Sequence, residues 1–180
     1  MKSNRTLKIV LTALMAAMTC IATMVIKVPS PTGGYIHLGD GLVLLSGIIL
    51  GPIYGGLAAG IGSMFADIFS GYVGFAAATL IIKALAAIIG SIVYHLFIKL
   101  FHNTIQKLIA LVLAGICGGF IVTSGYFIFE GFIMGLGIGT ALSGIPFNII
   151  QNVFGIIVSI VLMPVLGKVP VVKEMMEKVA

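Results

Sequence analysis

Long apolar runs, separated by short stretches rich in glycine and proline, follow one another along almost the whole of this 180-residue chain. Soluble domains have about 25% charged residues, whereas this chain has 8% charged and 60% hydrophobic residues. Because a membrane-spanning helix needs about 20 mostly apolar residues, we predict an all-α integral membrane protein, a bundle of six transmembrane helices. The expected spans are residues 7–26, 41–50, 54–70, 75–97, 105–129 and 142–166.

The second run, residues 41–50, ends at Gly51-Pro52 and is short for a bilayer. We therefore expect it to be tilted, broken or packed inside the bundle rather than facing lipid throughout. Residues 1–180 would form a single transmembrane domain, with no room for a soluble catalytic domain. The sequence has no GxxxxGK[ST] nucleotide-binding loop, so energy for transport would come from a partner or an ion gradient.

The basic residues lie almost entirely on one side of the predicted spans. With six spans both termini share a side, and that side carries Lys2, Arg5, Lys8, Lys99, Lys107, Lys168, Lys173 and Lys178. Only Lys27 falls in an opposite-side loop, and Lys83 lies within a span. Since cytoplasmic loops are enriched in Lys and Arg, we predict a multi-pass protein of the cell membrane with both termini in the cytoplasm.

The segment between the first two spans, residues 29–40, reads PSPTGGYIHLGD. Its two prolines and three glycines disfavour a helix, and the charge asymmetry places it outside the cell. Tyr35, His37 and Asp40 are polar groups at the edge of the hydrocarbon, where such groups are rare unless they are functional. We therefore expect an extracellular lid loop over a ligand site. His37 is either a hydrogen-bond donor to a ligand or a loop residue that bonds the nearby backbone.

Polar residues within the predicted spans gather in the half of the bilayer next to this loop. They are Asp40, Asp67, Lys83, Tyr126, Glu130, Asn148, Gln151 and Asn152. A channel needs polar lining through the whole membrane. This one-sided distribution instead predicts a pocket that is open to the outside and closed below.

Asn148, Gln151 and Asn152 have the spacing i, i+3, i+4 and are expected to share one helix face. Amide groups offer donors and acceptors, which suits a neutral heteroaromatic ligand; hydrogen bonding between helices is the alternative. Glu130 would accept a hydrogen bond from a ligand amino or ring N–H group, or would form a salt bridge or a solvated helix end. All of these alternatives remain open at this level.

Lys83 and Asp67 are expected to pair with each other, because an unpaired buried charge is costly, with direct ligand contact as the alternative. Tyr35, Tyr126 and Phe147 would stack on a flat ring or belong to the aromatic belt of the membrane interface. No set of His, Cys, Asp and Glu residues has the spacing of a metal site, so we expect no bound metal.

Small residues form two further stripes. One lies in the first run, at Ala13, Ala16 and Ala17, and the other in the third, at Gly56, Ala59 and Gly60. Small faces allow close approach of helices. They serve either the packing of the bundle itself or the docking of another membrane subunit.

Three stretches together resemble a known family. They are the Ala-Leu-Met-Ala-Ala-Met run from Ala13, the Gly-Gly-Tyr-Ile-His-Leu-Gly-Asp loop ending at Asp40, and the Leu-Leu-Ser-Gly-Ile-Ile-Leu-Gly-Pro stretch from Leu44. Over nearly its whole length the chain resembles the substrate-binding S component of energy-coupling factor (ECF) vitamin transporters, found in bacterial cell membranes. The resemblance implies a transport subunit without enzymatic activity, which binds a vitamin or precursor on the outside.

The same resemblance implies partners. S components associate with a transmembrane coupling subunit (EcfT-like) and two cytoplasmic ATPases, so ATP would be used by partner subunits and this chain would bind no cofactor. The stripe Ala13, Ala16 and Ala17 matches the coupling-subunit contact of the family. The loop between the first two spans matches its substrate lid.

Within the family, the His-Leu-Gly-Asp loop resembles members assigned to hydroxymethylpyrimidine, the thiamine precursor, or to pyridoxine. Hydroxymethylpyrimidine is the favoured expectation. Pyridoxine remains open, as does pantothenate with Lys83 as its carboxylate partner. The absence of tryptophan argues mildly against a large ring system such as riboflavin. A standalone secondary transporter would show inverted repeats and an intramembrane enzyme a nucleophile–base or metal set; the sequence shows no convincing example of either.

Overall fold

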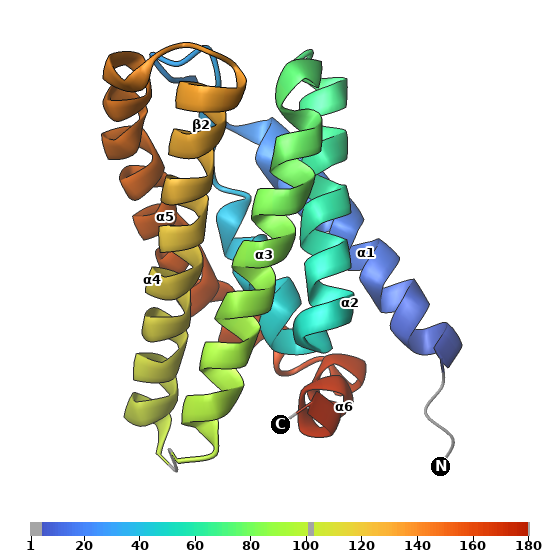
Figure 1. The fold of residues 1–180 in the computed structure, drawn as a ribbon. Coiled ribbons are helices and arrows are strands. Elements are labelled where there is room, and N and C mark those ends of the chain that lie inside the picture. Colours follow the sequence, from blue (N-terminus) through green and yellow to red (C-terminus); the bar gives the residue numbers. More distant parts are fainter. Residues whose placement is uncertain (1–4, 101–102, 180) are drawn as a thin grey trace.

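The computed structural model describes residues 5–100 and 103–179, which form a nearly all-helical bundle (Figure 1). Its elements are α1 (Arg5–Val25), β1 (Lys27–Pro29), β2 (Tyr35–His37), α2 (Asp40–Phe69), α3 (Val73–Ile98), α4 (Thr104–Ile128), the π-helix η1 (Phe129–Ile133), α5 (Ile138–Leu166) and α6 (Pro170–Val179). Five helices are long and apolar enough to cross a membrane: α1, α2, α3, α4 continued by η1, and α5. The predicted helical membrane bundle is confirmed.

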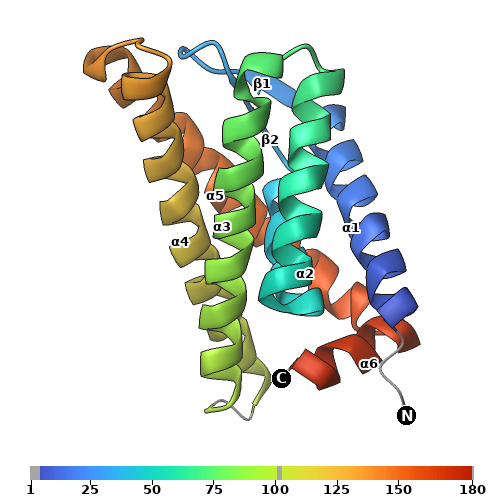
Figure 2. The same ribbon diagram turned by 45° about the vertical axis from the view of Figure 1, so that its right-hand side comes forward.

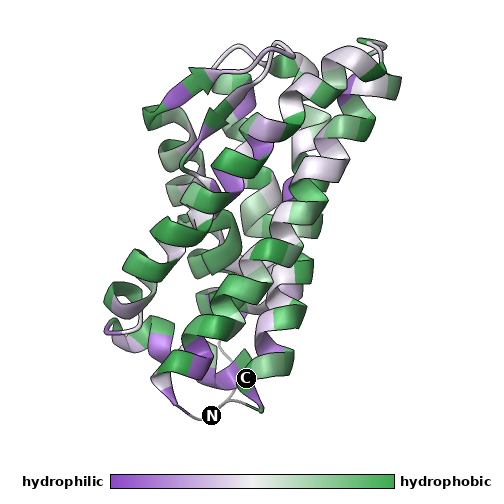
Figure 3. Ribbon diagram, turned by 90° about the vertical axis from the view of Figure 1, so that its left-hand side faces the viewer, coloured by the Kyte–Doolittle hydropathy of each residue, from purple (hydrophilic) through white to green (hydrophobic). Residues whose placement is uncertain are grey.

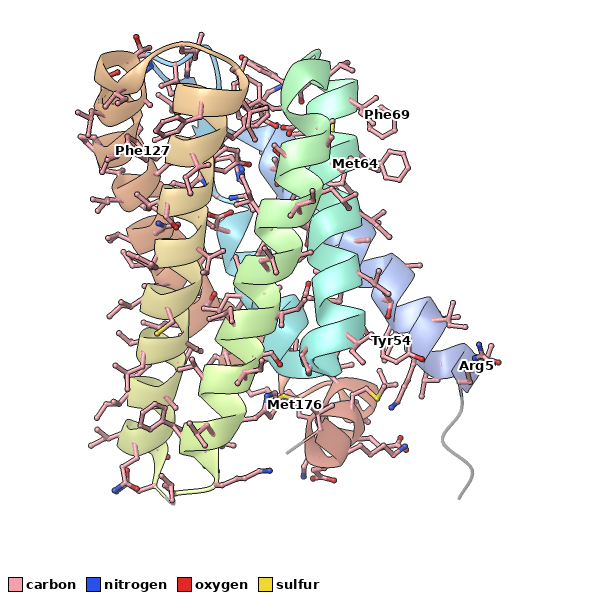
Figure 4. All side chains as sticks on the ribbon, viewed as in Figure 1. Arg5, Tyr54, Met64, Phe69, Phe127 and Met176 are labelled. Carbon is pink, nitrogen blue, oxygen red and sulfur yellow. The ribbon has the colours of Figure 1, made fainter. Side chains whose placement is uncertain are left out.

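The helix α2 reverses direction at Gly51, which has the non-helical dihedral angles φ 81° and ψ 176°. Only glycine adopts this conformation readily. A Cβ atom on Gly55 would lie 2.5 Å from the Cα atom of Gly47, whereas residues eight apart in a straight helix are separated by about 12 Å. Figure 4 shows Tyr54 and Phe69 at opposite ends of the arm that follows the reversal. The two runs predicted at 41–50 and 54–70 are thus the arms of one tight helical hairpin.

The first arm of α2 forms the centre of the bundle. Every residue from Asp40 to Gly51 is buried. Close packing on α3 depends on Gly47, where a Cβ atom would come within 2.3 Å of the carbonyl oxygen of Ala87. An arm surrounded by protein need not match the thickness of the bilayer. This explains how so short a segment fits, and it confirms the prediction that it packs inside the bundle.

The bundle has two distinct ends (Figures 1 and 2). We call the end that carries β1 and β2 the hairpin end, and the end near Arg5 and α6 the terminal end. Figure 3 shows hydrophobic residues along most of the helices and hydrophilic residues at both ends. The described basic residues at the terminal end are Arg5, Lys8, Lys99, Lys107, Lys168, Lys173 and Lys178, while Lys27 lies at the hairpin end. Lys2 lies outside the described residues.

The short helix α6 has no counterpart among the predicted elements. It buries Val172 and Met175 in a core cluster with residues of α1 and α2, including Leu11, Leu50 and Ala58. Figure 2 shows it crossing the terminal end of the bundle. Its charged residues interrupt the apolar pattern from which the other helices were predicted.

At the opposite end, residues 27–37 form a small antiparallel hairpin that pairs Lys27 with His37 and Pro29 with Tyr35. The predicted non-helical segment between the first two spans is therefore confirmed. After two connecting residues that follow β2, the chain enters α2 at Asp40. The hairpin thus leads directly into the buried arm, which fixes its position over the core.

Candidate functional site

A polar cavity lies at the hairpin end, between the hairpin, the helices α2, α3, α4 and α5, and η1. Its lining residues are Ser30, Gly34, Tyr35, Ile36, His37, Asp67, Phe75, Thr79, Tyr126, Glu130, Gly144, Phe147, Asn148 and Gln151. The space within it that a water molecule can enter is about 30 Å³, enough for about two waters. The cavity is therefore contracted, and a vitamin-sized ligand requires the walls to move apart.

Six of the nine predicted binding residues line this cavity: Tyr35, His37, Tyr126, Glu130, Asn148 and Gln151. The other three occupy different positions. Asp40 and Lys83 form a buried pair next to the cavity, and Asn152 faces α4. Contact of any of these residues with a ligand stays a prediction.

The side chain of Gln151 links the hairpin to the core. Its Oε1 atom accepts a hydrogen bond from the backbone N–H of His37 at 3.0 Å, and its Nε2 atom donates to Asp40 Oδ2 at 2.8 Å. Asp40 Oδ1 in turn accepts from Lys83 Nζ. These bonds fix the orientation of the Gln151 amide and join β2, α5, α2 and α3 in one buried network.

The expected pairing of Lys83 with Asp67 is wrong, because Lys83 forms its salt bridge with Asp40. Lys83 is fully buried and Asp40 is 7% exposed. The reversal at Gly51 explains the difference: it turns the first arm of α2 into the centre of the bundle and brings Asp40 against α3. Asp67, on the outer arm, instead accepts a hydrogen bond from the hydroxyl of Tyr35 at 2.7 Å.

Glu130 is buried in the π-helix η1 with a side chain only 4% exposed. Its Oε1 atom accepts a hydrogen bond from Thr32 Oγ1 at 2.7 Å, whereas its Oε2 atom is buried without a hydrogen-bond partner. No salt bridge joins it to any residue that the structure describes. Neither the salt bridge nor the solvated helix end considered from the sequence is present, and π-helical turns of this kind occur frequently at functional sites.

The amide trio of α5 is divided between two environments. Asn148 and Gln151 line the cavity, whereas Asn152 donates to the carbonyl of Gly119 at 2.8 Å and to Thr123 Oγ1 at 3.0 Å. One residue step turns a helix by about 100°, so Asn152 points to α4 and not into the cavity. The expectation of a single shared face is wrong for Asn152, which holds two helices together.

His37 is a neutral side chain in this site. Its Nδ1 atom accepts a hydrogen bond from the backbone N–H of Gly39 at 3.0 Å, so Nε2 carries the proton. Burial and, next, the charge of Lys83 lower the pKa of His37 to about 3, with Asp40 opposing the shift. The bond to the nearby backbone is one of the two roles expected for His37, and the ring lines the cavity as well.

Tyr35 anchors the hairpin tip to α2. Burial, followed by the adjacent carboxylate of Asp67, raises the pKa of its hydroxyl well above the usual value. The hydroxyl therefore stays protonated and acts as the donor in the bond to Asp67. Its ring packs on Tyr72, with ring centroids 4.4 Å apart.

The sequence did not single out two functional-looking residues of the cavity wall, Phe75 and Thr79, or Thr32 beside the cavity. Thr32 holds Glu130, Thr79 bonds the hydroxyl of Tyr126 at 2.9 Å, and Phe75 forms an apolar wall. Thr79 precedes Lys83 by four residues, and Phe75 precedes Thr79 by another four. Residues at i, i+4 and i+8 share one face of a helix. Starting from Lys83, the one charged residue in the span, this spacing could have predicted that Thr79 and Phe75 face the cavity.

The alanine stripe of α1 is also divided. Ala13 and Ala17 are exposed, but the backbone of Ala16 packs on α2, where a Cβ atom on Gly62 would come within 2.4 Å of the Ala16 carbonyl oxygen. The bundle-packing role therefore holds for Ala16. Gly56 and Gly60 likewise pack on α3, against Ile88 and Leu80.

Comparison with known proteins identifies the family. The family described as "ECF-type riboflavin transporter, S component" matches residues 3–168. The chain belongs to this family. It is thus a multi-pass membrane protein of a family of transporter subunits, as the resemblance of the three sequence stretches implied.

Two further similarities agree with this assignment. The chain is 30% identical over 139 residues to a Pyrococcus woesei protein described as an uncharacterized protein in a gap 3' region, covering 77% of this chain and 86% of that protein. A structure described as "Structure and mechanism of the S component of a bacterial ECF transporter" aligns with a TM-score of 0.68 at 20% identity, covering 91% of this chain and 97% of that one. The second similarity concerns the fold alone.

Proposed function

We propose that this S component captures hydroxymethylpyrimidine, or a close single-ring relative, on the outside of the cell for an ATP-driven ECF importer. The observation that carries the proposal is the polar cavity at the hairpin end, in a bundle that has no comparable polar cavity among its described parts at the other end. The concentration of Lys and Arg at the terminal end supports a cytoplasmic location for that end. The cavity would then face outwards.

The hairpin would act as the lid of this cavity. Three side-chain hydrogen bonds tie residues 32–37 to helices: Thr32 to Glu130, Tyr35 to Asp67, and the His37 backbone to Gln151. Each such bond contributes about 0.5–3 kcal/mol, with the higher values for charged acceptors. Opening the lid therefore costs a few kcal/mol of hydrogen-bond free energy. The bonds form again when the hairpin closes over a bound ligand, which suits a lid.

The cavity walls suit a small flat heterocycle. Phe75, Phe147 and Tyr126 supply ring or edge surfaces, and Asn148 supplies an amide with both donor and acceptor atoms. A contracted cavity of this kind has to expand less for one ring than for the tricyclic ring of riboflavin, the substrate in the family's name. Pyridoxine and pantothenate are the other single-unit candidates, and riboflavin is tested beside them.

Release into the cell would require a coupling subunit and two ATPases, since this chain offers no nucleotide-binding loop. The exposed residues Ala13 and Ala17 of α1, flanked by the exposed Val10 and Leu14, form the proposed contact with the coupling subunit. Small residues in an otherwise apolar stripe allow a second membrane helix to approach closely.

Equilibrium binding to the purified full-length chain tests the proposal. Hydroxymethylpyrimidine, pyridoxine, thiamine, pantothenate and riboflavin are compared by equilibrium dialysis in the same detergent. We expect hydroxymethylpyrimidine to bind most tightly and without ATP. Tight binding of riboflavin alone would overturn the substrate, and binding of none of the five would overturn the vitamin-capture role.

A further inference from the structure

We propose that the cavity selects ligands that present hydrogen-bond donors to two carboxylates, Glu130 and Asp67, and rejects ligands that carry a carboxylate of their own. This inference rests on the proposed capture function and specifies the chemistry of its substrate. It makes Glu130 and Asp67 the residues that determine specificity.

The two carboxylates share an unusual feature. Glu130 is 4% and Asp67 5% exposed, and each has one oxygen, Oε2 and Oδ2 respectively, that is buried without a hydrogen-bond partner. They come from different elements, η1 and α2, and both line the same cavity. Of the four unpartnered buried side-chain oxygens in the part of the chain that the structure describes, these two are the carboxylate oxygens.

An unpaired buried carboxylate oxygen destabilises a protein, because the group loses its hydration without compensation. The other oxygen of each residue is already used, by Thr32 and by Tyr35. The free oxygens therefore point to a donor that the protein does not supply. A ligand with N–H or O–H groups at two points of its rim supplies both.

The charges around the cavity oppose an anionic ligand. None of its lining residues is Lys or Arg, and His37 is neutral because its Nδ1 atom accepts from Gly39. The nearby cation Lys83 is engaged by Asp40. A ligand carboxylate would meet two negative side chains and no available positive one, an arrangement that discriminates by repulsion as well as by attraction.

This chemistry ranks the candidate substrates. An amino-substituted pyrimidine with a hydroxymethyl group presents N–H and O–H donors on neighbouring ring positions, and pyridoxine presents O–H donors. Pantothenate carries a carboxylate and is excluded. The alternative in which Lys83 holds that carboxylate is disfavoured, because Lys83 is paired with Asp40.

Matched ligands and variants test the inference on the purified full-length chain. The ligand pairs are hydroxymethylpyrimidine with its analogue lacking the amino group, and pantothenol with pantothenate. The variants are Glu130→Gln and Asp67→Asn. They keep the side-chain size but replace one carboxylate oxygen by the NH2 group of a neutral amide. Thr32→Val is the control, since it removes the bonds of the Thr32 hydroxyl to the occupied oxygen of Glu130 and to Ser30 and leaves both carboxylates in place.

Loss of the amino group should weaken binding to the unsubstituted chain about 10- to 100-fold, as for a hydrogen bond to a charged group. This ratio should fall towards one in Glu130→Gln or in Asp67→Asn and persist in Thr32→Val. Pantothenol should bind more tightly than pantothenate. An unchanged ratio in both carboxylate variants, or tighter binding of pantothenate than of pantothenol, would overturn the inference.

A readout without ligand separates this inference from the proposed substrate. If the free carboxylate oxygens await a donor, Glu130→Gln and Asp67→Asn should raise the unfolding temperature of the ligand-free chain, whereas Thr32→Val should lower it. Higher unfolding temperatures together with no binding of the compounds named would overturn the substrate and support the two carboxylates as a ligand site. Unchanged or lower temperatures in both variants would overturn the inference itself.

Discussion

Removal of Lys83 should destabilise this protein far more than removal of any surface lysine. In Lys83→Met, the Asp40 carboxylate stays buried, 7% exposed, and keeps only the hydrogen bond from Gln151. Breaking a buried ion pair from one side costs about 3–5 kcal/mol. For a chain of this size, 1 kcal/mol lowers the unfolding temperature by about 2–4 °C, so we expect a decrease on the order of 10 °C.

The assay is thermal unfolding of the detergent-solubilised chain, followed by circular dichroism. Lys27→Met is the matched control, because the Lys27 ammonium makes an exposed hydrogen bond to Ser70 and its removal should change the free energy of unfolding by less than about 0.5 kcal/mol. The double variant Asp40→Leu/Lys83→Met should recover most of the loss, since it leaves no uncompensated charge. Equal shifts for the two single variants, or no recovery in the double variant, would refute the reasoning.

Three further predictions concern other parts of the molecule. Gly51→Ala should lower the free energy of unfolding by about 1–2 kcal/mol because the residue needs a positive φ. Gly74→Ala is the control, since its Cβ atom would lie in open space. Chemical denaturation in mixed micelles measures both, and equal effects would contradict the reversal at Gly51. The stability contribution of neutral His37 should be full above pH 6.5 and decline as the pH falls towards 3, by up to about 1.4 kcal/mol per pH unit; a His37→Gln chain with the same pH profile would contradict this. Ala13→Leu should abolish co-purification with a coupling subunit and leave ligand binding intact. Ala16→Leu should also reduce stability, because Ala16 is the member of the alanine stripe that packs on α2. Loss of ligand binding in Ala13→Leu would contradict this division of roles among the alanines.

The depth of each residue in the membrane could be read from the sequence, because distance along a helix follows from residue number. This is why Tyr126, Glu130, Asn148 and Gln151 meet at one cavity as expected. The asymmetry of the basic residues placed the loop at the same end. Depth and charge together therefore predicted where a polar cavity would lie, and ligand binding in it stays a prediction.

The direction in which each side chain points was harder to predict, since it depends on which helices are neighbours. Lys83 and Asp67 lie at suitable depths for a pair, but the reversal at Gly51 brings Asp40 between Lys83 and Gln151 of α5. Asn152 differs from Gln151 by one helical step and faces another helix. Neither outcome follows from spacing, because both depend on tertiary packing.

The most direct test of the account is the dissociation constant of hydroxymethylpyrimidine for the purified full-length chain, measured by equilibrium dialysis without ATP or partner subunits. We expect saturable binding to one site per chain, weakened at least about tenfold in Glu130→Gln and little changed in Asn152→Ala, whose side chain faces α4. Absence of saturable binding, or binding that depends on Asn152 and not on Glu130, would contradict the account.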